Sequence, residues 1–448
     1  MPSSIEFEKE RIQKDLSVFK SFLRELKADT YDTTQFKRLR QAVSQISDAF
    51  EKTISARLAA IPSAYAPEDV STRIDELRKA INSLYNMLYI TIFKNMDVPP
   101  ELYYFTDHCL ENCSVKANYV LCLGETIQTQ NLEWLLRDFK SIYPEFWEEV
   151  QHVKFYSVHF IRRLADRNSS LDWSLLVHEM GHIVDIETGL IDKMMPGVDY
   201  YSAYQLVLAD KTGDPGYDKS KKRVLVGEYL ADFISTQCLG GAFGWRFLKE
   251  FMTLENIFED QRTHPDLNPR IREMINQIND QLSLPMISKI LESELTMRLK
   301  ELNEVRTPFK RDYVELEDAF RRAAKLINFS ATRDAIKNLL KEKLVGTPAR
   351  KIDNDFDRVL MNLQRNFLRG RPIVVEPALL YLIYMYGIDN RSLVKERAKN
   401  FETGATELNL EQSDFEGLVQ ELIADCIKLH AVAEKYQRKI PSVPPIPS

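Results

Sequence analysis

One run of ten residues constrains the fold of this chain more than any other stretch. Residues 175–184 read LLVHEMGHIV, in which His178, Glu179 and His182 are polar and every other position is apolar or glycine. A segment this apolar predicts a buried helix, where unpaired imidazoles are costly. We therefore expect the three polar side chains to share a partner, and a metal ion is the simplest one.

The spacing of these residues also indicates the kind of metal. Positions four apart share one face of an α-helix, so His178 and His182 can aim two imidazoles at one ion. Glu179 stands beside them, where it can take a proton from a metal-bound water. Because Zn²⁺ lowers the pKa of bound water while three protein ligands hold it, the motif predicts Zn²⁺ with Glu179 as general base. The alternative is a helix with two surface histidines.

A third ligand is expected further along the chain. Asp185 and Thr188 stand where a metzincin would continue its ligand motif, which excludes that class. Glu228 and Asp232 lie four apart in the otherwise apolar run at residues 224–235, and like charges at that spacing repel. Zinc on Glu228, with Asp232 accepting the spare N–H of a ligand histidine, would satisfy both carboxylates. A solvated helix face is the alternative, and weaker competitors for the metal are Asp185, Glu187, Asp192 and Asp210.

A third polar element follows at residues 262–271, RTHPDLNPRI. Pro265 restricts the backbone next to His264. A histidine or arginine near the metal can stabilise the oxyanion of a tetrahedral intermediate, which makes His264 a candidate catalytic residue. The alternative is a turn that enters a helix, with Arg270 in a surface ion pair. Weaker candidates for the same role are Tyr200, Tyr201 and Tyr204.

These three elements, in this order, resemble the gluzincin peptidases. More narrowly, they resemble the family of the membrane heat-shock protease and the CaaX prenyl endopeptidases. That family shows HExxH, then a Glu-x-x-Ala-Asp helix, then Thr-His-Pro with Arg-Ile shortly after. Here the three elements are residues 178–182, 228–232 and 263–271, and the resemblance covers about residues 170–275.

The resemblance implies a zinc metallopeptidase, that is, a hydrolase acting on a protein or peptide substrate. It implies Zn²⁺ on His178, His182 and Glu228 and Glu179 as the base, with Asp232 behind the ligands and His264 and Arg270 near the cleft. A likeness to zincins also implies an edge strand beside the active-site helix that pairs with the extended substrate, and we assign residues 154–160 to it. Members of the family often carry transmembrane helices. The longest apolar stretch here, residues 378–388, is shorter than the roughly 20 residues that a membrane span needs.

We expect a mainly α, α+β fold, in which a zincin-like core with a small β-sheet and an active-site helix is flanked by helical regions. The expected ranges are an N-terminal helical bundle at 1–97, the metallopeptidase core at 98–275, a C-terminal helical domain at 276–440 and a Pro-rich tail at 441–448. Apolar residues three or four apart predict N-terminal helices at residues 5–26, at 34–60 and after Ser71 as N-cap.

Within the core and beyond it, the sequence predicts short elements. Aromatic and aliphatic runs predict strands, and longer periodic segments predict helices. The expected strands are 102–105, 118–123 and 154–160, and a polar loop is expected at 210–222. The expected helices are 132–139, one starting near 172, 223–239, 286–302, 313–327, 333–344, 356–367, 377–385 and 410–436.

Composition narrows the class of protein. A net charge of −6 and a pI of about 5.8 argue against nucleic-acid binding. Five irregularly spaced cysteines predict buried free thiols, and the N-terminus lacks a secretory signal, so a soluble cytoplasmic protein is expected. The flanking helices would gate the cleft and hold the enzyme latent, recruit a substrate or form an oligomer. The rival functions are a zinc-binding regulatory or scaffold protein, a helical interaction protein with a chance HExxH, and a zinc hydrolase of non-peptide amides or esters.

Overall fold

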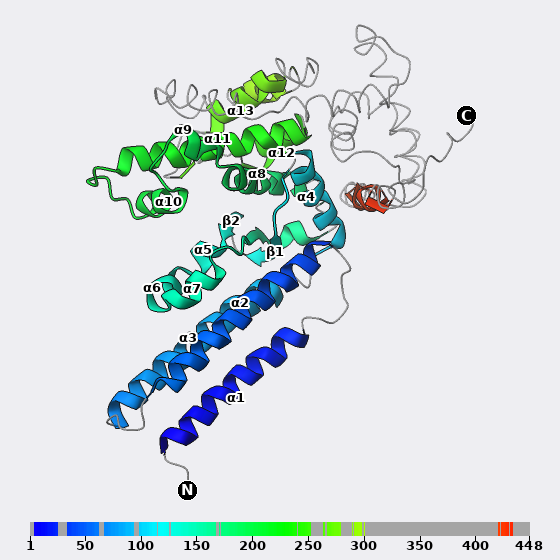
Figure 1. Ribbon diagram of the computed structural model, residues 1–448. Coiled ribbons are helices and arrows are strands. Elements are labelled where there is room, and N and C mark those ends of the chain that lie inside the picture. Colours follow the sequence, from blue (N-terminus) through cyan, green and yellow to red (C-terminus); the bar gives the residue numbers. More distant parts are fainter. Residues whose placement is uncertain are drawn as a thin grey trace. The chain divides into compact units, whose positions relative to one another are not determined.

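The computed structural model divides the chain into two compact units (Figure 1). The N-terminal unit comprises Met1–Pro100 and Ala117–Arg162, and the HExxH unit comprises Glu101–Lys116 and Arg163–Ser448. The structure describes residues 4–25, 34–61, 67–93, 98–113, 115–124, 127–166, 170, 172–239, 241–251, 263–264, 267–278, 289, 291–297, 300, 420–421, 423–429 and 431–432.

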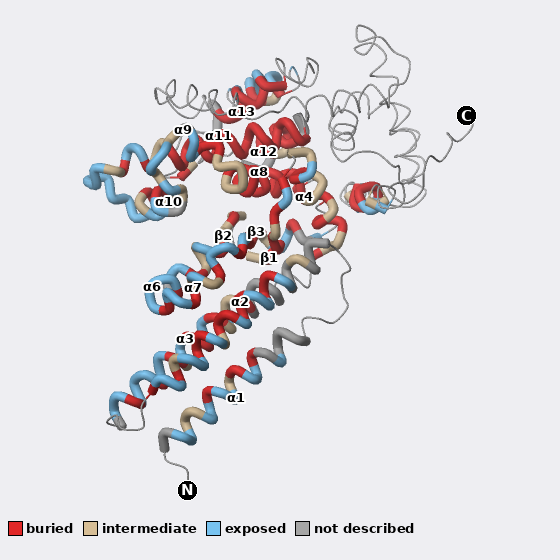
Figure 2. The backbone as a smooth tube through the Cα atoms, viewed as in Figure 1, coloured by how far each residue is buried: buried red, intermediate tan, exposed pale blue. Residues whose placement is uncertain are grey.

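Three long helices dominate the N-terminal unit: α1 (Ser4–Glu25), α2 (Thr34–Ala59) and α3 (Pro67–Phe93). Buried and exposed residues alternate along each of them, as Figure 2 shows. The first two helices match the predicted ranges, whereas α3 begins at Pro67 and places Ser71 inside the helix. Proline suits the first turn because its missing N–H would have no partner there, so the predicted start was wrong.

A three-stranded sheet completes the N-terminal unit. Its strands β1 (Tyr119–Gly124), β2 (Gln128–Asn131) and β3 (Tyr156–Ile161) lie in the order β1-β3-β2, with β1 parallel and β2 antiparallel to β3. Between β2 and β3 the chain forms the short helices α5 (Leu132–Leu135), α6 (Arg137–Ile142) and α7 (Pro144–Val150). One hydrophobic core joins the three long helices, β1 and these short helices.

Two strand predictions were wrong. Residues 154–160 were expected to form an edge strand, but β3 is the central strand of the described sheet and pairs on both sides. Its buried apolar residues, Tyr156, Val158 and Phe160, alternate along the strand and share one face, while its backbone pairs along both edges. Residues 102–105 were expected to be a strand but lie in helix α4 (Pro100–Asn112). The buried Leu102, Phe105 and Cys109 follow a spacing of three and four, so helical periodicity overrides the local aromatic preference for strand.

The described secondary structure of the HExxH unit is helical, with loops between the helices. After the 3₁₀ turn η1 (Arg162–Ala165) come α8 (Ser174–Thr188), α9 (Leu190–Met194), α10 (Tyr200–Leu208), α11 (Tyr217–Leu239), α12 (Gly241–Phe251) and α13 (Leu267–Gln277). Helices α9 and α10 were not predicted. The predicted loop at 210–222 ends early, because Gly216 closes a turn on Asp214 and α11 starts at the next residue.

Helices α8 and α11 form the centre of this unit. Figure 2 shows α8 and most of α11 buried, in contrast to the striped helices of the N-terminal unit. The two helices approach closely where Gly181 faces Ala231: a Cβ on Gly181 would lie 2.7 Å from the Cα of Ala231. Only glycine permits this distance, and it brings the HExxH motif directly against residues 228–232.

These elements confirm a mainly α, α+β fold, helical for the most part with one small mixed sheet. The four expected sequence ranges and the likeness to a zincin core stay predictions. The expected helices at 313–327, 333–344, 356–367 and 377–385 and the tail at 441–448 lie outside the described residues. None of the described helices is both long enough and apolar enough to cross a membrane.

The five cysteines carry free thiols, and four of them are buried, as predicted. Cys113 lies at the end of α4, and its Sγ is 3.8 Å from the Sγ of Cys238 on α11. The contact with Cys238, and next to it burial, raises the pKa of the Cys113 thiol well above its usual value. These thiols therefore behave as small packed side chains, which is the usual role of buried cysteine.

Candidate metal centre

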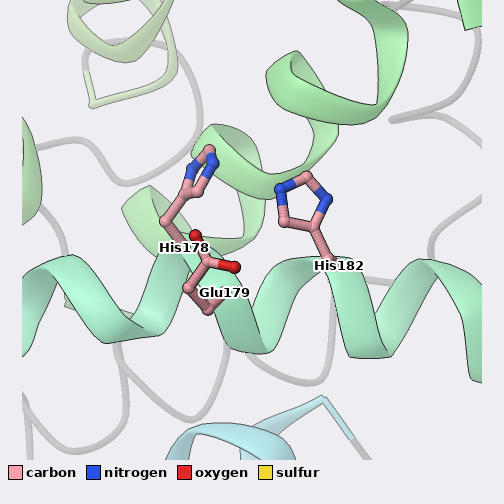
Figure 3. A group of neighbouring side chains, drawn as sticks. All are labelled: His178, Glu179 and His182. Atoms are coloured by element: carbon pink, nitrogen blue, oxygen red, sulfur yellow. The ribbon is translucent and has the colours of Figure 1, made fainter. Parts of the chain in front are cut away.

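Helix α8 presents the three motif side chains on one side (Figure 3). The metal-binding atoms of His178, Glu179 and His182 all lie within 4.8 Å of one another, so the group could hold a metal ion. The two imidazole rings are 4.9 Å apart between centroids and perpendicular. All three residues are at least nine-tenths buried, which would be costly for polar groups without a shared partner.

Glu228 on α11 meets both imidazoles from the opposite helix. Its Oε2 lies 3.2 Å from the Nε2 of His178, and its Oε1 lies 3.5 Å from the Nε2 of His182. Two ligands that sit about 2.0–2.1 Å from a tetrahedral ion are separated by about 3.3 Å. Both separations are close to that value, so Glu228 lies near enough to the two imidazoles to be a candidate third ligand.

His182 is a second buried polar group of this centre. Only 8 % of the residue is exposed, and its imidazole faces Glu228, with 3.5 Å between Nε2 and Oε1. Buried polar groups are nearly always hydrogen-bonded or bound to metal. A buried set of nitrogen and oxygen donors fits a transition metal.

Asp232, one helical turn after Glu228, supports the site from behind. Its Oδ1 lies 3.0 Å from the Nδ1 of His178, on the side of the ring opposite to Glu228. Arg270 of α13 donates two hydrogen bonds to the same carboxylate, from Nε to Oδ2 at 2.6 Å and from Nη2 to Oδ1 at 2.7 Å. A carboxylate on the second ring nitrogen fixes the orientation of a ligand histidine and raises its basicity. The predicted neighbours therefore do come together.

His264 also reaches this centre. Its Nε2 lies 3.3 Å from Glu228 Oε2, and the Nη2 of Arg270 lies 3.8 Å from the same oxygen. The Arg270 guanidinium stacks on the ring of Phe247, 4.6 Å from its centroid. Arg270 is therefore a buried clamp, in contrast to the surface ion pair that was the alternative.

Burial and neighbouring charges shift the pKa values in this centre. Burial alone would lower the pKa of His178, but the carboxylates of Asp232 and Glu228 outweigh it and raise the pKa to about 10. For His182 burial prevails over the attraction of Glu228 and lowers the pKa to about 4. Burial would raise the pKa of Glu228, but the facing imidazoles of His264, His178 and His182 hold it well below its usual range. Ionised carboxylates thus face imidazoles in this centre, an arrangement that also suits a bound cation.

Aromatic side chains enclose the two motif histidines. The ring of Phe243 on α12 stacks on His178, with 6.2 Å between centroids and 12° between planes. Tyr200 on α10 packs against His182 at 6.1 Å. A Cβ on Gly227 would lie only 3.2 Å from the Tyr200 ring, so this tyrosine is wedged against α11 directly before Glu228. Phe243 was not predicted, because an isolated phenylalanine in an apolar stretch gives no signal of its own.

Arg223 forms ion pairs with two of the carboxylates that were the weaker candidates for binding the metal. Its Nη2 lies 3.2 Å from Asp185 Oδ2 and 3.0 Å from Asp192 Oδ1, and its guanidinium lies 4.9 Å from the Tyr200 ring centroid. Asp185 also accepts a hydrogen bond from the backbone N–H of Ile191. The structure therefore pairs both aspartates with an arginine. The one arginine within the buried part of α11 was a signal that sequence reasoning missed.

Comparisons of this chain with protein-family models, with curated proteins and with solved structures found no match.

Proposed function

We propose that this chain is a zinc-dependent endopeptidase with its metal on His178, His182 and Glu228. The observation that carries the proposal is the convergence of two imidazoles from α8 and one carboxylate from α11 at separations suited to a single ion. Two imidazole nitrogens with one carboxylate are typical of catalytic zinc in peptidases. The ordered resemblance to the gluzincins supports the same metal and the same ligands.

Glu179 is the natural general base of this site. Its carboxylate stands on the histidine side of α8, while Glu228 makes the direct contacts to both imidazoles. Zinc, when bound, supplies a Lewis acid that lowers the pKa of a water molecule and polarises the peptide carbonyl. Glu179 accepts the proton of the attacking water and passes it to the leaving amide nitrogen.

The remaining polar residues position these groups. Asp232 holds the Nδ1 side of His178, and Arg270 holds Asp232 through two hydrogen bonds, so the imidazole stays aimed at the centre. Because Arg270 is occupied in this way, His264 is the better candidate donor to the oxyanion that forms during hydrolysis. The helical regions on either side of the motif would restrict which peptides enter.

The first test is zinc per chain by elemental analysis after mild chelator washing. We expect about one zinc in the wild type and a clear loss in Glu228→Ala, because metal affinity depends on every ligand. Glu148→Ala is the matched control: this glutamate is exposed on α7, so its removal should leave zinc unchanged. No zinc in the wild type, even after reconstitution, would refute the proposal and favour a helical interaction protein with a chance motif.

The second test is turnover of peptide libraries by the zinc-loaded chain. Wild type should cleave peptides, and Glu179→Gln should bind as much zinc but lose most of its activity, since removing a positioned general base costs about 10²–10⁴-fold. Retained zinc without cleavage of any peptide would favour a regulatory or scaffold protein. Cleavage confined to non-peptide amides or esters would keep the chemistry and change the substrate class.

A further inference from the structure

A third imidazole, that of His264, lies next to Glu228, although the proposed centre has only three ligands without it. The Nε2 of His264 lies 3.3 Å from Glu228 Oε2, the same oxygen that the Nε2 of His178 approaches at 3.2 Å. Among the described residues, the Nε2 of His264 has no hydrogen bond. Its separation from Glu228 nevertheless matches the roughly 3.3 Å expected between two ligands of one tetrahedral zinc ion.

The orientation of the His264 ring repeats that of His178. Its Nδ1 lies 2.9 Å from the hydroxyl oxygen of Thr263, which leaves Nε2 directed at the centre. His178 likewise faces a carboxylate oxygen with Nδ1 and the centre with Nε2. Histidines that bind metal nearly always engage the other ring nitrogen with an oxygen partner. Both rings are therefore prepared as ligands through Nε2.

We propose that His264 is a fourth protein ligand of the resting metal centre, which is therefore closed until His264 leaves it. The inference rests on the proposed zinc site and adds a ligand to it. A zinc ion held by four protein ligands has no open position, whereas catalysis needs one. The centre is thus closed at rest, and a bound peptide opens it by displacing the His264 imidazole, so the zinc-loaded wild type still turns over.

Exposure identifies His264 as the ligand that can leave. Its side chain is 41 % exposed, whereas those of His178, His182 and Glu228 are 11 %, 10 % and 3 % exposed. A substrate or an activating ligand that comes from solvent reaches His264 first. Helix α13 starts at Leu267, shortly after His264, and is anchored through Arg270 to Asp232. The histidine is therefore held near the centre without being buried in it.

The decisive experiment counts the imidazoles on zinc in the full-length chain. Zinc-edge X-ray absorption separates three imidazoles from two, because each ring adds its own outer-shell scattering. We expect three in the wild type and two in His264→Ala. In competition with a chromophoric chelator, that variant should bind zinc at least about 10-fold more weakly, since even partners behind the ligands are worth about that much. Adding free imidazole should restore the third ring.

His152→Ala is the matched control, because this histidine is exposed in the N-terminal unit and its loss should leave both the count and the affinity unchanged. Two imidazoles in wild type would overturn the inference without any need for a variant, and would leave the three-ligand site intact. An unchanged count in His264→Ala would overturn it equally. A chain that binds no zinc would overturn the inference together with the proposed function, so the two failures are distinguishable.

Discussion

The two units of this protein use charged residues in opposite ways. In the N-terminal unit, ion pairs such as Lys52 with Glu149 lie at the surface, with 72 % and 39 % of the side chains exposed, while the interior is aliphatic and aromatic. In the HExxH unit, Arg270 and Asp232 pair with each other while both side chains are 3 % exposed. Surface pairs contribute little to stability, whereas breaking a buried pair is costly. Removing a charge from a surface pair should therefore change stability little, whereas removing a charge from the buried pair should destabilise the fold.

The same contrast appears in the packing of helices. In the N-terminal unit the helices bury one stripe each, and ring edges interlock, as where Phe50 meets Phe139 and Phe146. In the HExxH unit, α8 and α11 meet backbone to backbone at Gly181 and Ala231. The buried face of an amphipathic helix tolerates small changes of side-chain volume. A contact between two helix backbones does not tolerate an added side chain. We therefore expect mutations in the two units to affect different measurements.

The largest expected effect is that of Arg270→Ala. It leaves the buried Asp232 carboxylate without its partner, which should lower the free energy of unfolding by about 3–5 kcal/mol. Zinc affinity should fall as well, because Asp232 then no longer holds His178 in place. Chemical denaturation and chelator competition measure the two effects. Lys52→Ala is the control from the other unit, with an expected cost of about 0–1 kcal/mol; similar costs for the two variants would contradict the comparison.

A smaller effect is expected for Gly181→Ala. The new Cβ would lie 2.7 Å from the Cα of Ala231, so the helices must separate. Overpacking of this kind costs about 1–3 kcal/mol. The better helix propensity of alanine returns at most about 1 kcal/mol, so we expect net destabilisation. Separation of α8 from α11 also moves Glu228 away from both imidazoles, and zinc affinity should fall.

Gly213→Ala is the matched control for that prediction. A Cβ at Gly213 meets nothing within 4 Å, so neither stability nor zinc affinity should drop. Equal zinc affinity in Gly181→Ala and wild type would mean that the close approach of the two helices does not position the ligands. The site would then depend on α8 alone.

The parts of the site that the sequence predicts are those that one helix can carry. His178, Glu179 and His182 share a face because of helical spacing, and two like charges in the apolar stretch of α11 indicated that Glu228 and Asp232 needed a partner. The contact between His264 and Glu228 joins residues 36 positions apart in sequence (264 − 228), and no local pattern sets such a distance. The sequence made His264 a candidate through its chemistry, and the resemblance placed it near the cleft, but neither predicted its contact with Glu228.

The errors in the fold have the same cause. Residues 102–105 have the composition of a strand, yet they continue a helical spacing of buried residues that is visible only over the whole of α4. The run at 154–160 predicts a strand correctly, but its neighbours in the sheet decide whether it is central or at an edge. The amino-acid preferences of a short segment predict its secondary structure and its place in a sheet less well than the segments that pack against it do.

The smallest effect on stability is expected for Ile54→Val in the N-terminal unit. This variant tests whether the core of that unit is independent of the metal centre. Ile54 is fully buried in the core that joins the long helices to β1, and the loss of one methylene should cost about 0.5–1.5 kcal/mol. Zinc per chain and zinc affinity should equal those of wild type, because none of the proposed ligands and none of their partners described above belongs to that core. Denaturation followed together with zinc titration gives both values. A loss of zinc affinity in Ile54→Val would show that the aliphatic core of one unit supports the charged centre of the other, and the two units would then have to be treated as a single cooperative structure.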